Sequence, residues 1–367
     1  MRASLHFSLR GKVGEGDTLS PLCLGAHMSI TGGLWRAIER VCAVGGSALQ
    51  LFTANQRRWD VPYPSPDDIR RFRVAYEAWG GVAASHASYL INLATPDTTL
   101  ADRSVAALGV ELQRSEALGL PYVVVHPGAH CGGGVAAGIE RVALRAAQAI
   151  DASQTRNVML LLENTAGQGT TLGADVIELA QMLEQIPVHM SAHVSAQTQG
   201  RMPDLAPDHM PDQTSDHVPD QMVNKLPDQA SHQMPDRTAG QQGTGHARSA
   251  RVGVCIDTAH AFAAGYDIAS GKGFTRFMDD LAEHVGLERL HFMHVNDSAV
   301  PCGSRKDRHA HIGEGGIGLG GFARVVNDPR LAGLPMVLET PKGDDLAEDR
   351  TNLAVLRGLW GKHPAAV

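Results

Sequence analysis

Six short apolar runs of this chain end in a residue that can bind a metal ion. Three of these residues are histidines and three are carboxylic acids: His86, His126, Glu163, Asp257, His294 and Glu339. Continuous runs of Val, Ile and Leu are typical of parallel strands that are buried on both faces. Since the carboxyl ends of parallel strands lie at the same edge of a sheet, we expect the six side chains to share one rim.

Two loops add further residues that can bind a metal. Asp257 and His260 form a D-x-x-H step after the sixth strand, and Asp307 and His309 form a D-x-H step after the seventh. Such short spacing lets two side chains of one turn converge on one ion. The candidate set then holds imidazoles and carboxylates but no thiolate: His86, His126, Glu163, Asp257, His260, His294, Asp307, His309 and Glu339.

This mixture of ligand types indicates more than one metal ion. Imidazole with carboxylate suits Zn²⁺, Mn²⁺ or Fe²⁺, and the set exceeds what one tetrahedral ion takes, so we expect two or three clustered ions. Buried acids in such number would be too costly without cations between them. Clustered divalent ions generate hydroxide at neutral pH and stabilise both oxygens of a phosphoryl displacement. From the residues alone, a multinuclear metal hydrolase and a metal-dependent sugar isomerase both stay open.

Repeated units of strand and helix must position these residues. Two earlier apolar runs, at residues 22–27 and 48–52, precede the six above, and helical patterns with one apolar face recur between the strands. Eight such units predict a (β/α)8 TIM barrel, an α/β fold that carries its chemistry at the carboxyl ends of the strands. An open doubly wound sheet is the alternative, and the absence of a GxGxxG motif after the first strand disfavours it.

One segment does not fit the barrel pattern. From residue 202 the sequence repeats every eight residues around Pro-Asp, beginning at Pro203, Pro211, Pro219, Pro227 and Pro235. With almost no aromatic or branched apolar residue, such a segment cannot bury enough surface to offset its ordering entropy. We therefore expect a disordered insertion at residues 189–250, a single barrel domain at residues 21–188 and 251–362, and a disordered N-terminal extension at residues 1–20.

Composition limits the partners of the chain. Its 367 residues carry a net charge of −7, which argues against binding nucleic acid through bulk positive charge and leaves a local patch or bound cations. No apolar run is long enough to span a membrane, so we expect no membrane partner. The five cysteines are scattered without a CxxC pair, which suits a reducing compartment such as the cytoplasm. For the N-terminal segment, a transit peptide and a ragged extension both stay open.

The order of several motifs is more specific than any one of them. Together they resemble endonuclease IV, the zinc-dependent apurinic/apyrimidinic endonuclease family, over about residues 22–360 without the Pro-Asp insertion. The motifs are GAH at 25–27, NQRRW at 55–59, HASYLINL at 86–93, HPG at 126–128, ENTAGQG at 163–169, CIDT at 255–258, HAFAAGYD at 260–267, HVND at 294–297, GSRKDRH at 303–309 and LET at 338–340. The resemblance implies a TIM barrel of the xylose-isomerase-like type.

The resemblance also implies a metal centre and a reaction. Three zinc ions would be bound, with Mn²⁺ as the alternative ion. The implied ligands are His86, His126 and Glu163 for one ion, Glu163 as a bridge with Asp257, His294 and Glu339 for the second, and His260, Asp307 and His309 for the third. The family hydrolyses the phosphodiester 5′ to an abasic site in duplex DNA, leaving a 3′-hydroxyl and a 5′-deoxyribose phosphate. Related enzymes trim blocked 3′ ends. We expect a monomer that works on DNA in the cytoplasm, or at the nucleoid in a bacterium.

Some residues are expected to act on the DNA rather than on the metal. The family flips the lesion out of the stack, which a missing base makes cheaper. By analogy Arg57, Tyr89 and Leu90 would fill the gap in the duplex, with Asn55 and Gln56 beside them, although each could instead be ordinary loop packing. Glu163 and Glu339 are the candidate catalytic residues, because a ligand carboxylate can also orient the attacking hydroxide.

The chain departs from the family pattern at a few positions. Ser85 stands where the family often has proline, Ala259 stands where cysteine is common, and no lysine follows Ser298. None of these is a metal ligand, so the departures bear on fine DNA contacts only. Two rival functions remain for comparison. They are a sugar isomerase on a similar barrel, disfavoured by the NQR motif at 55–57 and by the third ligand set, and a non-catalytic binder of DNA lesions, disfavoured by the intact ligands.

Overall fold

The computed structural model describes residues 22–199 and 251–362. The expected N-terminal extension, the whole Pro-Asp repeat and all but residues 189–199 of the expected insertion lie outside the described residues. In the part of the chain that is described, no helix is both long and apolar enough to cross a lipid bilayer.

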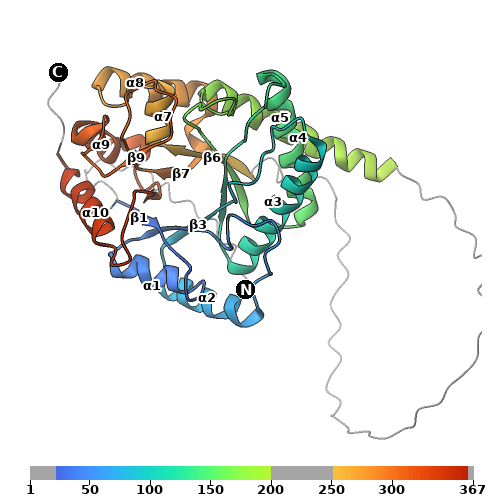
Figure 1. The fold of residues 1–367 in the computed structure, drawn as a ribbon, viewed down its shortest axis with the longest axis horizontal. Coiled ribbons are helices and arrows are strands. Elements are labelled where there is room, and N and C mark those ends of the chain that lie inside the picture. The colour runs from blue at the N-terminus through green and yellow to red at the C-terminus, as the bar shows by residue number, and fades with distance from the viewer. Residues whose placement is uncertain (1–21, 200–250, 363–367) are drawn as a thin grey trace, which may run out of the picture.

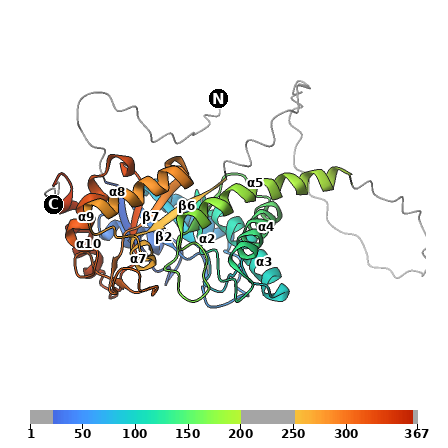
Figure 2. The ribbon, with the colours of Figure 1, turned by 90° about the horizontal axis from the view of Figure 1, so that it is seen from above.

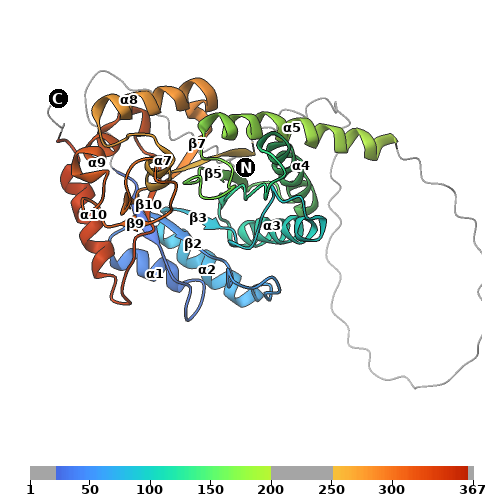
Figure 3. The same cartoon turned by 45° about the horizontal axis from the view of Figure 1, so that its top comes forward.

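A closed barrel of parallel strands forms the centre of the molecule, with helices around it (Figures 1 and 3). The strands follow each other around the barrel in chain order, and the first pairs with the last, so the predicted TIM barrel is confirmed. The barrel strands are β1 Leu24–His27, β2 Ala48–Leu51, β3 Val82–His86, β4 Tyr122–Val125, β5 Met159–Glu163, β6 Val252–Asp257, β7 Leu290–His294 and β10 Met336–Leu338.

Amphipathic helices cover the outside of the barrel. They are α1 Arg36–Ala43, α2 Pro66–Trp79, α3 Thr98–Leu118, α4 Val135–Ser153, α5 Val176–Gln199, α8 Gly271–Asp280, α9 Gly318–Asn327 and α10 Ala347–Leu359. The short helix α7 Thr258–Ala264 instead follows β6 directly and is almost entirely buried. Shorter pieces are a π-helix at Leu281–Val285 and 3-10 turns at Leu287–Arg289 and Pro329–Leu331. Local signals set both ends of α3, because Asp97 caps it by accepting from the Leu100 amide and Gly119 ends it in a left-handed conformation.

Side chains inside the barrel lie in layers. One buried layer is apolar and consists of Ala48, Ala84, Val124, Leu161, Cys255, Phe292 and Val337. Because side chains alternate along a strand, the residue two positions later points to the same side, one step nearer the carboxyl end. Applied to every strand, this step gives a set that we call the rim layer: His27, Gln50, His86, His126, Glu163, Asp257, His294 and Glu339.

Strand β1 joins this pattern through a glycine. Gly25 lies two residues before His27 and is the register partner of Ala48. A Cβ atom at Gly25 would lie 1.5 Å from the Ala48 carbonyl oxygen, so only glycine lets β1 approach β2 this closely. Each of the eight strands therefore contributes one residue to the rim layer, six of which are the expected strand-end ligands.

Helix α5 continues to Gln199 and reaches outward past the other helices (Figure 2). It thus runs beyond residue 188, where the sequence places the end of the first barrel segment. The chain returns to the barrel at Val252, the first residue of β6. Val252 and Asp257 are at opposite ends of β6. The segment that joins α5 to β6 therefore enters β6 at the end of the barrel away from the rim layer. The boundary of the insertion stays a prediction.

Candidate metal centre and adjacent loops

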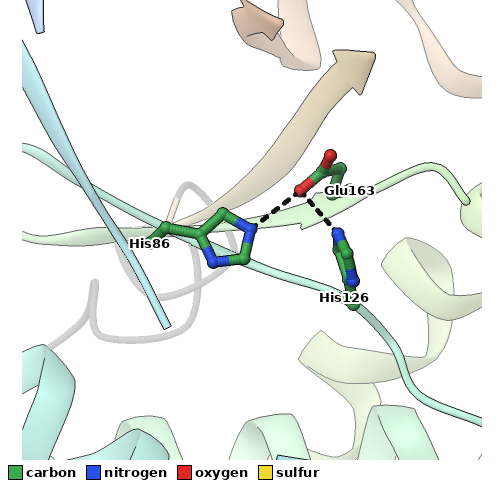
Figure 4. A group of neighbouring side chains, drawn as sticks. All are labelled: His86, His126 and Glu163. Carbon is green, nitrogen blue, oxygen red and sulfur yellow. Dashed lines mark hydrogen bonds and ion pairs between the residues drawn. The ribbon is translucent and has the colours of Figure 1, made fainter. Parts of the chain in front are cut away.

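The first ligand group consists of His86, His126 and Glu163 (Figure 4). These residues come from the ends of three neighbouring strands, β3, β4 and β5. Both imidazoles direct Nε2 to the same carboxylate oxygen, Oε2 of Glu163, each at 3.1 Å. Glu163 is fully buried and His86 nearly so, whereas the His126 side chain is 29% exposed, which leaves this group open toward solvent on one side.

The second ligand group consists of Glu163, Asp257, His294 and Glu339. Nδ1 of His294 lies 2.9 Å from Glu163 Oε1, 3.2 Å from Glu339 Oε2 and 3.7 Å from Asp257 Oδ2. Glu163 therefore presents one oxygen to the first group and the other oxygen to the second. This is the arrangement of a carboxylate that can bridge two ions.

The third ligand group surrounds His260 and His309. Nε2 of His260 lies 3.3 Å from Asp307 Oδ2, and Nε2 of His309 lies 3.2 Å from Asp307 Oδ1 and 3.6 Å from Asp257 Oδ2. Asp257, His260 and His309 have ligand atoms within 4.8 Å of one another. Asp257 thus belongs to two groups, a feature that strand-end position alone did not indicate. All nine expected ligands are brought together.

Two local structures place the loop ligands. Asp257 ends β6 and caps α7, since its Oδ1 accepts from the His260 amide at 2.8 Å, which sets His260 in the first turn. His309 begins β9 (His309–Ala310), which pairs with β8 (Asp297–Ser298). The buried Asp297 carboxylate accepts from several amides of the following loop, including those of Gly313 and Ile317 at 3.0 and 2.9 Å. These bonds fix the loop that follows His309.

Charge pairing governs the ionisation of the cluster. Burial raises the pKa of the Glu163 carboxyl, but His294 and His126 outweigh this and lower it well below its ordinary value. Burial lowers the pKa of the His260 imidazole, but Asp257 and Asp307 raise it well above its ordinary value. The same balance raises the pKa of His309 to about 9, chiefly through Asp257. The imidazoles and carboxylates of the cluster therefore each favour the charged form of the other.

The residues present fit a set of zinc ions. The donors are imidazole nitrogens and carboxylate oxygens, both of which bind Zn²⁺. Nε2 of His309 is buried and makes no hydrogen bond within the described residues, although it faces Asp257 and Asp307. A buried nitrogen without a hydrogen bond between two carboxylates is an open coordination position.

Two loops that carry the expected DNA contacts lie beside the ligand groups. Tyr89 follows β3 and is 59% exposed, with its ring centroid 5.4 Å from that of His86 and 6.0 Å from that of His126. The hydroxyl of Ser88 donates to the Gln56 carbonyl at 2.7 Å and so ties the loop after β3 to the loop after β2. Arg57 in the latter loop is exposed.

The remaining candidates, Asn55 and Leu90, differ in their exposure to solvent and in their hydrogen bonds. Asn55 is exposed, but its Oδ1 accepts from the Arg57 amide at 2.9 Å and so shapes the turn. Leu90 is partly buried, and its amide donates to the Ser88 hydroxyl at 3.2 Å. The structure therefore places the five expected DNA-contacting residues on two joined loops next to the first ligand group.

The comparisons with known proteins agree with this geometry. A family model described as a xylose isomerase-like TIM barrel matches residues 38–197 and 244–358. A probable endonuclease 4 of Nitratidesulfovibrio vulgaris is 43% identical over 338 residues, which is 92% of this chain and 99% of that protein. The chain belongs to the endonuclease IV family. It is accordingly a nuclease, as the motif order predicts.

Solved structures include one relative from the endonuclease IV family and one protein that shares only the barrel fold. The crystal structure of endonuclease IV from Thermus thermophilus superposes with a TM-score of 0.68 at 33% identity, covering 92% of this chain and 98% of that one. A D-tagatose 3-epimerase-like protein superposes with a TM-score of 0.55 at 13% identity, covering 91% of this chain and 96% of that one. The second likeness shows the barrel fold alone, so it does not favour sugar chemistry over the endonuclease IV assignment.

Sequence reasoning missed the polar residues that support the ligands in this endonuclease IV family member. His27 and Gln50 are the rim-layer residues of β1 and β2, and neither was among the expected ligands. Asn296 donates to Asp257 Oδ2 at 2.7 Å, and its side-chain oxygen accepts from the Glu339 amide at 2.7 Å. The two-residue step from the apolar layer selects His27 and Gln50, but a search for ligand types at strand ends does not select an amide.

Proposed function

We propose that this chain is an abasic-site endonuclease of DNA repair, which hydrolyses the phosphodiester 5′ to the lesion in duplex DNA and leaves a 3′-hydroxyl and a 5′-deoxyribose phosphate. One observation carries the proposal. Glu163 belongs to the first and second ligand groups and Asp257 to the second and third, so the ions they would bind would lie close enough to act on one phosphate. Membership of the endonuclease IV family, and the naming of its relatives as endonucleases, support the substrate class.

Three zinc ions are the proposed cofactors, with Mn²⁺ as the alternative. His86, His126 and Glu163 would hold one, Glu163, Asp257, His294 and Glu339 the second, and His260, Asp307 and His309 the third. Asp257 is also near enough to serve the third. When bound, zinc lowers the pKa of water and neutralises charge on the phosphate oxygens.

The side chains have separate tasks in this proposal. Glu163 Oε1 and Glu339 Oε2 lie 2.9 and 3.2 Å from His294 Nδ1, so these two oxygens border one space in which they would orient the attacking water. Arg57, Tyr89 and Leu90 would fill the gap left in the duplex, with Asn55 and Gln56 beside them. Their position on the joined loops next to His86 supports this role.

The proposal extends to the range of substrates and the setting. The same centre would trim blocked 3′ ends, since that reaction also transfers a phosphoryl group to water beside a 3′ oxygen. We propose that the enzyme acts as a monomer on DNA in the cytoplasm, at the nucleoid if its source is a bacterium.

An elemental analysis paired with an incision assay tests the proposal. Purified protein should hold close to three zinc ions per chain and should cut an oligonucleotide duplex at a single abasic analogue. Chelator should abolish the cut, and added zinc should restore it. An aldose panel run in parallel tests the sugar isomerase alternative. A folded protein with fewer than two tightly held transition metals, or incision that survives their removal, would rule the proposal out.

A further inference from the structure

Gln50 occupies the place in the rim layer at which six other strands carry a metal ligand. Its side chain is fully buried and contacts two of the proposed ligands. We propose that Gln50 is a positioning residue that fixes which nitrogen of His294 faces the metal and holds the Glu339 carboxylate in place. This inference rests on the proposed metal centre.

The hydrogen bonds of Gln50 leave one consistent assignment. An ionised carboxylate can only accept, so the amide nitrogen of Gln50 must be the atom that faces Glu339 Oε1, at 2.5 Å. The amide oxygen then faces Nε2 of His294, at 2.8 Å, and an oxygen can only accept. Nε2 of His294 must therefore carry the proton. In the neutral ring, Nδ1 is left as the free ligand atom, and Nδ1 is the atom that faces Glu163, Glu339 and Asp257.

His294 differs in this respect from other imidazoles of the cluster. Nδ1 of His86 bonds to the Ala87 carbonyl at 2.7 Å, and Nδ1 of His260 bonds to the Asn164 carbonyl at 2.9 Å. Nε2 of His86 faces Glu163 and Nε2 of His260 faces Asp307, and Nδ1 of His260 also lies 3.2 Å from Glu163 Oε1. His294 uses the opposite nitrogen, and its orienting partner is a side chain of another strand. A backbone carbonyl is present whatever the residue type, whereas Gln50 can be replaced.

The second amide proton of Gln50 also has a partner. Nε2 of Gln50 lies 3.0 Å from Nδ1 of His27, the rim-layer residue of β1, and the His27 carbonyl accepts from Lys342 at 2.9 Å. Both N–H groups and the oxygen of the Gln50 amide are thus engaged without solvent. An amide with every polar atom bonded in a buried site has one orientation, which is what a positioning residue needs.

Substitution of Gln50 should weaken the binding of one zinc ion, the one at the second ligand group, more than that of the others. Q50M keeps the length of the side chain but removes all three hydrogen bonds, so we expect zinc affinity at the second ligand group to fall about 10- to 100-fold. At a chelator concentration that leaves three ions on the parent, Q50M should retain fewer, and excess zinc should restore incision. Q113M is the control, because Gln113 is exposed on α3 and its side chain donates to the Ser153 carbonyl and belongs to none of the ligand groups.

A second variant separates the two contacts. Q50E keeps an acceptor for His294 but cannot donate to Glu339. We expect Q50E to keep the ring orientation of His294, whereas Q50M loses it. A merely structural role would lower the melting temperature of either variant without changing zinc affinity, so thermal unfolding is measured alongside.

A spectroscopic measurement on the unaltered, zinc-loaded protein needs no variant to fold. Proton–nitrogen correlation spectra of its histidines should show His294 protonated at Nε2, and His86 protonated at Nδ1. Protonation of His294 at Nδ1, or parental zinc affinity in folded Q50M, would overturn the role of Gln50. If the parent itself binds no zinc tightly, the proposed function fails instead, so the two failures are distinguishable.

Discussion

At the scale of single residues, Glu163 connects the site more than any other side chain. Its Oε2 faces His86 and His126, and its Oε1 faces His294. Replacement by Gln would keep the shape but remove the charge and one acceptor oxygen. We expect E163Q to lose at least about 100-fold in incision rate, because two ions lose a ligand at once.

The measurement for E163Q is incision of an abasic duplex under single-turnover conditions, together with zinc content. E140Q is the control, since Glu140 is exposed on α4 and belongs to none of the three ligand groups. Incision by E163Q at the parental rate would show that the metal-hydrolase assignment is wrong.

Residue types at strand ends were sufficient to select six side chains that the structure brings together, because His, Asp and Glu are rare in buried parallel strands and their presence needs a reason. The sharing of Asp257 between two groups depends on the turn into α7, which residue types do not encode. Gln50 was missed for a different reason. An amide is not a metal ligand, and its role follows only from its contacts with His294 and Glu339.

At the scale of elements, helix α3 holds both ends of the loop that carries Asn55, Gln56 and Arg57. Near the start of the loop, the Thr53 hydroxyl donates to Glu111 at 2.7 Å. Near the end of the loop, the Arg114 guanidinium donates to the carbonyls of Val61 and Pro62, at 2.7 and 3.2 Å. Glu111 and Arg114 are one helical turn apart, so one short stretch of α3 fixes the whole loop.

Removing Arg114 should therefore loosen the loop without disturbing the metal. Hydrogen bonds from a charged group contribute about 1.5–3 kcal/mol, and a loop that must be ordered on binding DNA loses affinity accordingly. We expect R114M to raise KM for an abasic duplex about 10-fold while kcat and zinc content stay near parental values.

Steady-state kinetics and elemental analysis check this prediction. R73M is the matched control, because the exposed Arg73 also donates to a backbone carbonyl, that of Ala117, but away from the loop. An unchanged KM in R114M, or an equal rise in R73M, would contradict a role of α3 in holding this loop.

At the scale of the whole molecule, the net charge of −7 implies that the proposed zinc ions would contribute to the attraction between the protein and DNA. Removal of the ions should therefore weaken binding to abasic duplex as well as abolish incision, and it should lower the melting temperature, because ions that bind only the folded chain stabilise it. Fluorescence anisotropy with a labelled duplex and a thermal scan, each with and without chelator, test this. Binding that is insensitive to chelator would argue that fixed positive side chains suffice.

The barrel could be predicted from the sequence because eight apolar runs recur with helical patterns between them, a pattern that few folds share. The end of α5 could not be predicted in this way. Apolar residues at helical spacing predict the first turns of this helix, and Pro187 would ordinarily end or kink it, yet the helix continues through Pro187 to Gln199. Helix boundaries depend on capping and packing more than on pattern.

The attachment of the Pro-Asp segment predicts that it is dispensable for incision. It leaves α5 after Gln199 and returns at Val252, at the end of β6 opposite Asp257. Deletion of residues 202–240 should leave kcat/KM within about 2-fold of the parent. It should raise the free energy of unfolding by about 1 kcal/mol, because the loop falls to about a quarter of its length and a shorter loop costs less entropy to close. Replacement of the same residues by a Gly-Ser sequence of equal length separates loop length from composition. If the deleted enzyme keeps its fold and zinc but loses most of its incision, the segment takes part in catalysis or in DNA binding and its assignment to the far rim is wrong.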